Sequence, residues 1–143
     1  MQAIRDGEPD ALAILAQAAA VLWMTFERIN WAGFYLMRGG DLVLGPFQGK
    51  PACTRIRIGS GVCGTAADRR ESLVVPDVLA FPGHIACDSA SRSEIVVPVM
   101  HGGEVVAVID VDSPEPDRFG EDDRRFLEEL SLMLAPQCGA LAS

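Results

Sequence analysis

Two pairs of adjacent glycines, each set between two strand-like runs, constrain the fold of this chain more than any other feature. The pairs are Gly39-Gly40 and Gly102-Gly103. A Gly-Gly pair between runs rich in β-branched and aromatic residues is a hairpin signal. The sequence therefore predicts two β-hairpins, whose strands are WAGFYLMR (31–38) with DLVLGPFQ (41–48), and SEIVVPVMH (93–101) with EVVAVIDVDS (104–113).

Further elements follow from the same kind of pattern. CTRIRIG (53–59) and SLVVPD (72–77) predict two more strands, and PDALAILAQAAAVLWMTFER (9–28) and GVCGTAADRR (61–70) predict helices. A last helix is expected in FGEDDRRFLEELSLMLA (119–135), where acids open the first turn and Pro136 should end or kink it. About six mostly hairpin-linked strands with a helix at each end predict an α+β fold: a mostly antiparallel sheet with the terminal helices on one face.

The bulk composition limits the partners. The chain has 143 residues, 49% of them hydrophobic, so residues 1–143 are expected to form a single domain. Twelve basic against twenty acidic residues give a net charge of −8, which argues against nucleic acid and anionic membranes. The first apolar stretch follows acids rather than the basic residues of a signal peptide, and no apolar run reaches about 20 residues. A cytoplasmic protein is expected.

The long loop from Asp77 to Arg92 lacks strand alternation, and within FPGHIACDSASRSE (81–94) Cys87 lies in a polar, turn-forming neighbourhood. Long loops inside compact domains are usually functional or disordered. The apolar residues Phe81, Ile85 and Ala86 favour a packed lid over disorder. The setting of Cys87 therefore points to chemistry rather than packing.

The four cysteines are the next question, because cytosolic thiols stay reduced unless a disulfide is catalytic or sensing. Cys63 lies near the N-terminus of the helix predicted at 61–70, where the helix dipole stabilises a thiolate. Two alternatives stand beside reactivity: small buried residues, or a zinc site in which His84 joins Cys53, Cys63 and Cys87. Their spacings of ten and twenty-four residues lack the close pairs of structural zinc sites. Cys138 is expected to be a packing residue or a free thiol.

Acids and aromatics complete the candidate site. Strand alternation directs Val106, Val108, Asp110 and Asp112 to one face, and Val105, Ala107 and Ile109 to the other. Two carboxylates on one face raise the pKa of one of them, so that a neutral acid can donate a proton. A solvated strand end is the alternative. Glu94 begins the neighbouring strand and could reach the same corner.

Trp31 and Tyr35 lie four residues apart on the first strand, hence on one face, as core or as the wall of a pocket.

These residues and their motifs resemble those of a known family, the free methionine-(R)-sulfoxide reductases, which are stand-alone GAF domains. The resemblance covers nearly the whole chain, and three cysteines within these motifs are specific to the family. The departures are a short N-terminus and a C-terminal tail that contains Cys138. The matching motifs are INWAGFYL, GPFQGKPACTRI, GVCGTAA, VVPDVLAFPGHIACDSASRSEIVVPV, VIDVDSP and RFGEDDRRFLEEL.

The resemblance implies a GAF-like sheet whose pocket is covered by loops on the face opposite the terminal helices. It also implies a reaction, the reduction of free L-methionine (R)-sulfoxide to methionine without a bound cofactor or metal. Cys87 would attack the sulfur and become a sulfenic acid. Cys53 would resolve it as a disulfide, Cys63 would be a second exchange partner, and thioredoxin would restore the thiols.

The same resemblance assigns the pocket. Glu94 and Asp112 would serve the proton chemistry, and Asp110 would hold the substrate ammonium. Trp31 and Tyr35 would wall the methyl end, and the backbone N–H groups of Ile85, Ala86 and Cys87 would hold the carboxylate. A homodimer is compatible with the family. The alternative function is a redox-active GAF sensor module that binds a small molecule without catalysis, against which the three-cysteine pattern and the lack of an output domain argue.

Overall fold

A six-stranded antiparallel sheet forms the centre of the computed structural model, which describes residues 7–84 and 90–143. The strands are β1 (Trp31–Arg38), β2 (Asp41–Gly49), β3 (Arg55–Arg57), β4 (Leu73–Val75), β5 (Ser93–His101) and β6 (Glu104–Ser113), in the order β3-β2-β1-β6-β5-β4. The helices are α2 (Ala11–Thr25), α3 (Gly61–Arg69), α4 (Glu121–Leu141) and the short 3-10 helix η1 (Val78–Ala80). All neighbouring strands pair antiparallel, which confirms the expected α+β arrangement.

Both predicted hairpins are present. The turn between β1 and β2 has φ angles of 60° at Gly39 and 84° at Gly40, and the turn between β5 and β6 has 61° at Gly102 and 82° at Gly103. Two successive residues with positive φ suit the twist of a two-residue hairpin, and glycine adopts them without steric cost. The glycine pairs therefore decided how these strands connect.

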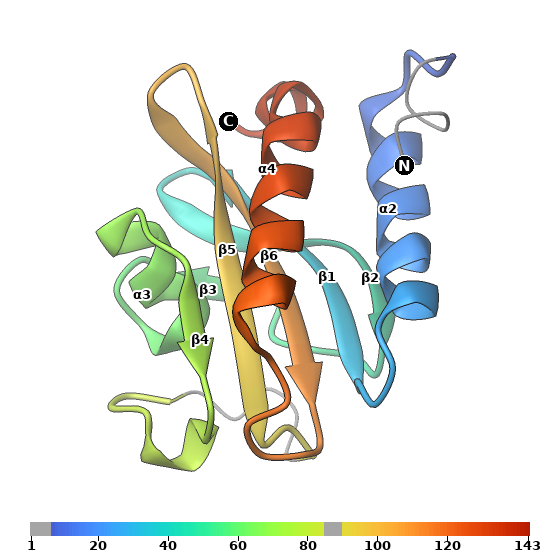
Figure 1. The fold of residues 1–143 in the computed structure, drawn as a ribbon. Helices are drawn as coiled ribbons and strands as arrows, with labels where there is room; N and C mark the ends of the chain where they lie inside the picture. Colours follow the sequence, from blue (N-terminus) through green and yellow to red (C-terminus); the bar gives the residue numbers. More distant parts are fainter. Residues whose placement is uncertain (1–6, 85–89) are drawn as a thin grey trace.

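The two faces of the sheet carry separate hydrophobic clusters. On one face α2 and α4 lie side by side over the strands (Figure 1), and Leu15, Leu22 and Leu134 pack there against Phe34. On the other face Val62 and the rest of α3 pack against a second cluster that includes Trp31, Tyr35, Leu42, Val96 and Val108. The terminal helices thus cover one face, as expected, and leave the other to α3 and the loops.

The alternation expected along β6 was wrong at its start. Val105 packs in the cluster on the α3 face, whereas Val106 contacts the cluster under α2 and α4. The cause is a register shift: Val99 pairs with Ala107, but the next residue, Met100, pairs with Val105. A β-bulge of this kind inserts one extra residue and reverses the inside-outside order before it. From Ala107 onward the predicted alternation holds.

Helix α4 continues through Pro136 to Leu141, so Pro136 does not end the helix, and the kink expected as the alternative stays a prediction. Leu134 and Cys138, on either side of the proline, are fully buried against the sheet, and this packing holds the last turns in place. The residue whose carbonyl loses its helical donor is Leu132, which is 76% exposed and faces solvent.

Among the described residues, no helix is both long and apolar enough to cross a membrane.

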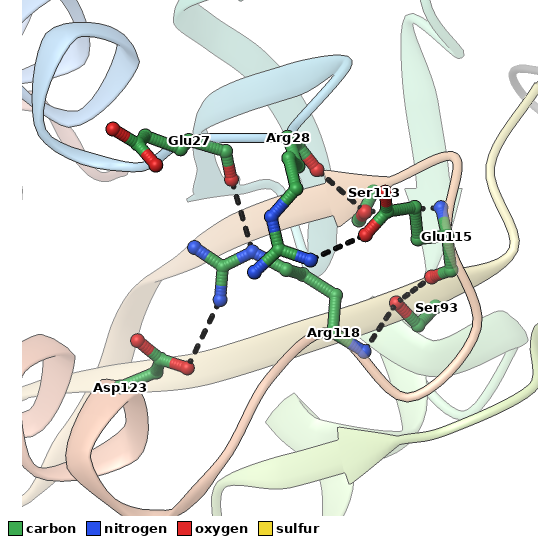
Figure 2. A network of polar contacts seen from close by, with 7 residues as sticks. All are labelled: Glu27, Arg28, Ser93, Ser113, Glu115, Arg118 and Asp123. Atoms are coloured by element: carbon green, nitrogen blue, oxygen red, sulfur yellow. Dashed lines mark hydrogen bonds and ion pairs between the residues drawn. The ribbon is translucent and has the colours of Figure 1, made fainter.

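A network of polar contacts closes the ends of β5 and β6 (Figure 2). Ser113 Oγ donates to the carbonyl of Arg28 at 2.6 Å and accepts from the backbone N–H of Glu115 at 3.1 Å. Ser93, which pairs with Ser113 across the two strands, donates through Oγ to the carbonyl of Glu115 at 2.6 Å. Both serines are fully buried.

Arg118 connects this network to α4 and to the residues just after α2. Its Nε donates to the carbonyl of Glu27 just after α2, at 2.9 Å, and its Nη1 contacts Asp123 in the first turn of α4 at 3.4 Å. Its guanidinium also lies 5.7 Å from the ring centre of Phe26 and 5.3 Å from that of Phe119. The strand ends next to Glu94 and Asp112 are therefore fixed from several elements at once (Figure 2).

Candidate active site

A pocket lies on the sheet face that α2 and α4 leave free. Its walls come from β1, β6 and the start of β5, from the N-terminus of α3, and from loop residues on both sides of residues 85–89. The lining residues are Trp31, Tyr35, Ala52, Ile56, Ser60, Gly61, Val62, Cys63, His84, Ser91, Glu94, Asp110 and Asp112.

The three predicted acids meet in this pocket. Glu94 lies directly opposite Asp112 in the pairing of β5 with β6, and Asp110 lies two residues before Asp112 on the same face. Glu94 is 8% exposed and Asp110 is 4% exposed. Oδ1 of Asp110 is buried and has no hydrogen-bond partner among the described residues. The alternative of a solvated strand end is therefore wrong for Asp110.

Burial changes the protonation of these acids. It raises the pKa of Glu94 well above its ordinary value, and the charge and hydrogen bonding of Asp110 raise it further. It also raises the pKa of Asp110, to which the charge of Asp112 adds. An acid that keeps its proton at neutral pH can donate it to a developing anion. The pocket therefore holds carboxylic acids suited to protonating a bound oxygen.

Cys63 sits in the first turn of α3, as the sequence indicated, and its thiol faces the acids. Its Sγ donates to Oε2 of Glu94 at 3.9 Å. The expectation that the helix dipole would favour its thiolate was wrong, because burial and then the charges of Asp110 and Glu94 raise the pKa of the thiol. Cys63 is thus a buried neutral thiol in this arrangement.

A stack of aromatic rings forms the opposite wall. The rings of Trp31 and Tyr35 stack with centroids 5.7 Å apart, and the ring of Phe47 also stacks on Trp31, at 5.2 Å. Trp31 Nε1 donates to the carbonyl of Lys50 at 3.2 Å. Trp31 and Tyr35 therefore do share one face and line the pocket, as predicted from their spacing.

Phe47 was missed by the sequence analysis, although Gly33 offered a signal. A Cβ atom at Gly33 would lie 2.4 Å from Cβ of Phe47 and 2.7 Å from the carbonyl oxygen of Pro46. Glycine inside a strand often marks such a close approach of another backbone. Gly33 thus brings β2 close enough for Phe47 to extend the aromatic wall.

The cysteines divide into a bonded one and two free ones among the described residues. Cys53 is disulfide-bonded, and its carbonyl accepts a hydrogen bond from the Tyr35 hydroxyl at 3.2 Å. Cys63 and Cys138 are free. Cys138 belongs to α4 and is fully buried in the cluster between the terminal helices and the sheet, where burial raises its pKa to about 12, so it is a packing residue as expected.

Part of the predicted site lies outside the described residues, namely Cys87 and the amides of Ile85 and Ala86. The two described residues nearest to this segment in the pocket wall are His84 and Ser91.

The hypothetical zinc site of Cys53, Cys63, Cys87 and His84 includes Cys87, which lies outside the described residues, so it stays untested. The group of described side chains able to hold a cation is a different one, formed by Cys63, Glu94 and Asp110.

Comparisons with known proteins extend these observations. A family model described as GAF domain matches residues 7–135. The free methionine-R-sulfoxide reductase of Escherichia coli is 48% identical over 132 residues, which cover 92% of this chain and 80% of that protein. The enzyme of the same name from Saccharomyces cerevisiae is 42% identical over 145 residues, which cover 96% of this chain and 81% of the yeast protein.

A solved structure is also similar. It is the X-ray structure of free methionine-R-sulfoxide reductase from Neisseria meningitidis in complex with its substrate. It superposes with a TM-score of 0.91 at 45% identity and covers 97% of this chain and 84% of the Neisseria chain. The six-stranded antiparallel sheet and the three α-helices of the described residues therefore form the GAF fold.

Proposed function

The chain belongs to the free methionine-R-sulfoxide reductase family of GAF domain proteins, and from this premise we propose that it reduces free L-methionine (R)-sulfoxide to L-methionine. The observation that carries the proposal is the pocket in which Glu94, Asp110 and Cys63 gather opposite the Trp31–Tyr35 wall. Reduction of methionine sulfoxide requires an acid to protonate the sulfoxide oxygen, a thiol to reduce the sulfur, and an apolar surface to contact the methyl group.

Cys87 is the proposed nucleophile, and covalent geometry supports its reach. It follows His84, which lines the pocket, by three residues. Three residues span at most about 11 Å, so the Cys87 Cα stays within that distance of the His84 Cα. The thiolate of Cys87 would attack the sulfoxide sulfur and take the oxygen as a sulfenic acid while methionine leaves.

Protons for this step come from the buried acids. The oxygen of the sulfoxide gains negative charge as the sulfur is attacked, and a protonated carboxyl beside it can donate. The raised pKa of Glu94 supplies such a donor at neutral pH. We assign this role to Glu94 with Asp112, and assign Asp110 to the substrate ammonium.

The wall and the loop amides would fix the remaining parts of the substrate. Trp31 and Tyr35 would contact the methyl end, and backbone N–H groups of Ile85, Ala86 and Cys87 would hold the carboxylate. A pocket that holds both the ammonium and the carboxylate excludes methionine within a peptide. This is the physical reason for the restriction to the free amino acid.

Recycling would pass through Cys53. Its thiol would attack the sulfenic acid of Cys87, release water and form a disulfide. The bonded state of Cys53 supports this step, since Cys63 and Cys138 are free thiols and Cys87 is the remaining cysteine of the chain. Cys63 is assigned to a second exchange, and the dithiol of thioredoxin would reduce the disulfide.

The test is turnover with free L-methionine (R)-sulfoxide and dithiothreitol, followed by amino-acid analysis. We expect methionine from the (R) epimer and at least about 100-fold less from the (S) epimer or from N-acetylated substrate. Cys87→Ser should abolish turnover, because a hydroxyl of high pKa cannot replace the thiolate. Cys138→Ala is the matched control, since this free thiol belongs to α4 on the opposite face of the sheet.

Two results would overturn the assignments. Turnover by Cys87→Ser would remove Cys87 as nucleophile, and binding of the sulfoxide by the wild type without any methionine release would favour the sensor function. Mass-spectrometric mapping after one equivalent of substrate, without reductant, tests the disulfide. A Cys63–Cys87 bond instead of a Cys53–Cys87 bond would exchange the roles of the two resolving cysteines.

A further inference from the structure

The acid and thiol cluster of the pocket has the geometry of a cation site. One sulfur atom of Cys63 and one carboxylate oxygen each of Glu94 and Asp110 all lie within 4.8 Å of one another. The three residues come from α3, β5 and β6, and all three are buried. Because the ligands come from three different packed elements, their arrangement does not depend on a single loop.

The distances suit a metal ion of borderline softness. In tetrahedral zinc sites, Zn–S is about 2.3 Å and Zn–O is about 2.0–2.2 Å, so neighbouring ligand atoms lie about 3.3–3.7 Å apart. The Cys63 Sγ and Glu94 Oε2 atoms are 3.9 Å apart. The three ligand atoms thus need to move by less than about 1 Å to meet the ion.

Asp110 adds an independent sign of a missing ligand. It is only 4% exposed and lines the pocket, yet its Oδ1 has no hydrogen-bond partner among the described residues. Buried carboxylate oxygens without a partner are costly and call for a proton donor or a cation. Among the described lining residues there is neither a lysine nor an arginine to supply a counter-charge.

We propose that the pocket binds Zn²⁺ through Cys63, Glu94 and Asp110, and that the ion excludes the substrate. Binding of the ion is independent of the catalytic assignment. The exclusion rests on the proposed function, because the ion occupies the place given to the substrate ammonium. Zinc is then an inhibitor of the pocket and no part of the reaction.

The test separates this cluster from the other thiols. Zinc chloride is titrated calorimetrically into the oxidised chain, in which Cys53 is disulfide-bonded and Cys63 and Cys138 are free. We expect one ion per chain, and affinity at least about tenfold weaker in Cys63→Ser and in Asp110→Asn. Cys138→Ala, the control, should bind as the wild type does.

A second readout follows ligation directly. Co²⁺ in place of Zn²⁺ should give a thiolate-to-cobalt charge-transfer band that is lost in Cys63→Ser and kept in Cys138→Ala. Glu94→Gln, which keeps the shape of the side chain, provides a further variant should Cys63→Ser not fold. Circular dichroism shows whether each variant is folded before the titration.

The outcomes are distinct. Absence of zinc binding by the wild type, or affinity unchanged in all folded variants of the cluster, overturns the inference. Binding that Cys138→Ala abolishes also overturns it. If zinc binds with the expected dependence but the chain releases no methionine, the metal site stands and the proposed function falls. If the chain releases methionine but does not bind zinc, the proposed function stands and the metal site falls.

Discussion

Replacing Ser113 with alanine should lower stability more than a surface serine would, because its hydroxyl joins two backbone groups. Ser113→Ala removes a 2.6 Å hydrogen bond to the Arg28 carbonyl and a 3.1 Å bond from the Glu115 N–H. Each buried bond contributes about 0.5–1.5 kcal/mol, and a partner left unsatisfied costs about 1–3 kcal/mol. Because the side chains of Arg28 and Glu115 are 58% and 48% exposed, water can reach part of this region, and we expect about 2–3 kcal/mol in total.

Urea unfolding followed by circular dichroism measures this free energy, and thermal melts should show Tm lower by about 6–15 °C. The matched control is Ser131→Ala, whose hydroxyl donates to the Glu128 carbonyl within α4. That carbonyl stays inside the helix, so the control should change stability by less than about 0.5 kcal/mol. Equal effects of the two substitutions would refute the argument that the Ser113 network fixes the strand ends.

Three further predictions concern the pocket and its walls. Asp110→Asn should raise Tm relative to the wild type, by an amount that grows as the pH rises above about 4. The folded chain holds a proton on Asp110 that the unfolded chain releases above the ordinary pKa of 3.8, so wild-type stability falls as the pH rises. A difference in Tm between wild type and variant that does not change with pH would contradict this. Gly33→Ala should prevent folding or lower Tm strongly, because the added Cβ would lie 2.4 Å from Cβ of Phe47. If the variant melts at the same temperature as the wild type, β2 can move away from this position. Tyr35→Phe removes the 3.2 Å hydrogen bond to the Cys53 carbonyl but keeps the aromatic ring. In a single turnover it should slow disulfide formation, measured by quenched-flow thiol labelling, and leave methionine release unchanged. An unchanged labelling rate would show that this hydrogen bond does not position Cys53.

Much of the fold was predictable because its signals are local. The glycine pairs carry the backbone freedom that the two hairpin turns need, and these turns set the pairing of β1 with β2 and of β5 with β6. Asp110 and Asp112 share a face because alternation depends only on the backbone of one strand. The same rule predicted that Trp31 and Tyr35 share a face of β1.

Other features depended on packing between distant segments. The bulge beside Met100 reversed the faces of Val105 and Val106, and no residue type there announced it. Pro136 stays inside α4 because Leu134 and Cys138 are buried against the sheet. In both cases tertiary contacts outweighed a local preference.

The protonation of the site was also decided by the tertiary structure. The sequence by itself determined which strands and helices form and that two acids share one face. Only the fold brought Cys63 and Glu94 to Asp110 and excluded water from all three. A pKa responds to solvent and to charges within a few ångströms, and these distances join residues far apart in the chain, so the raised pKa values of this pocket exist only once α3, β5 and β6 have packed together.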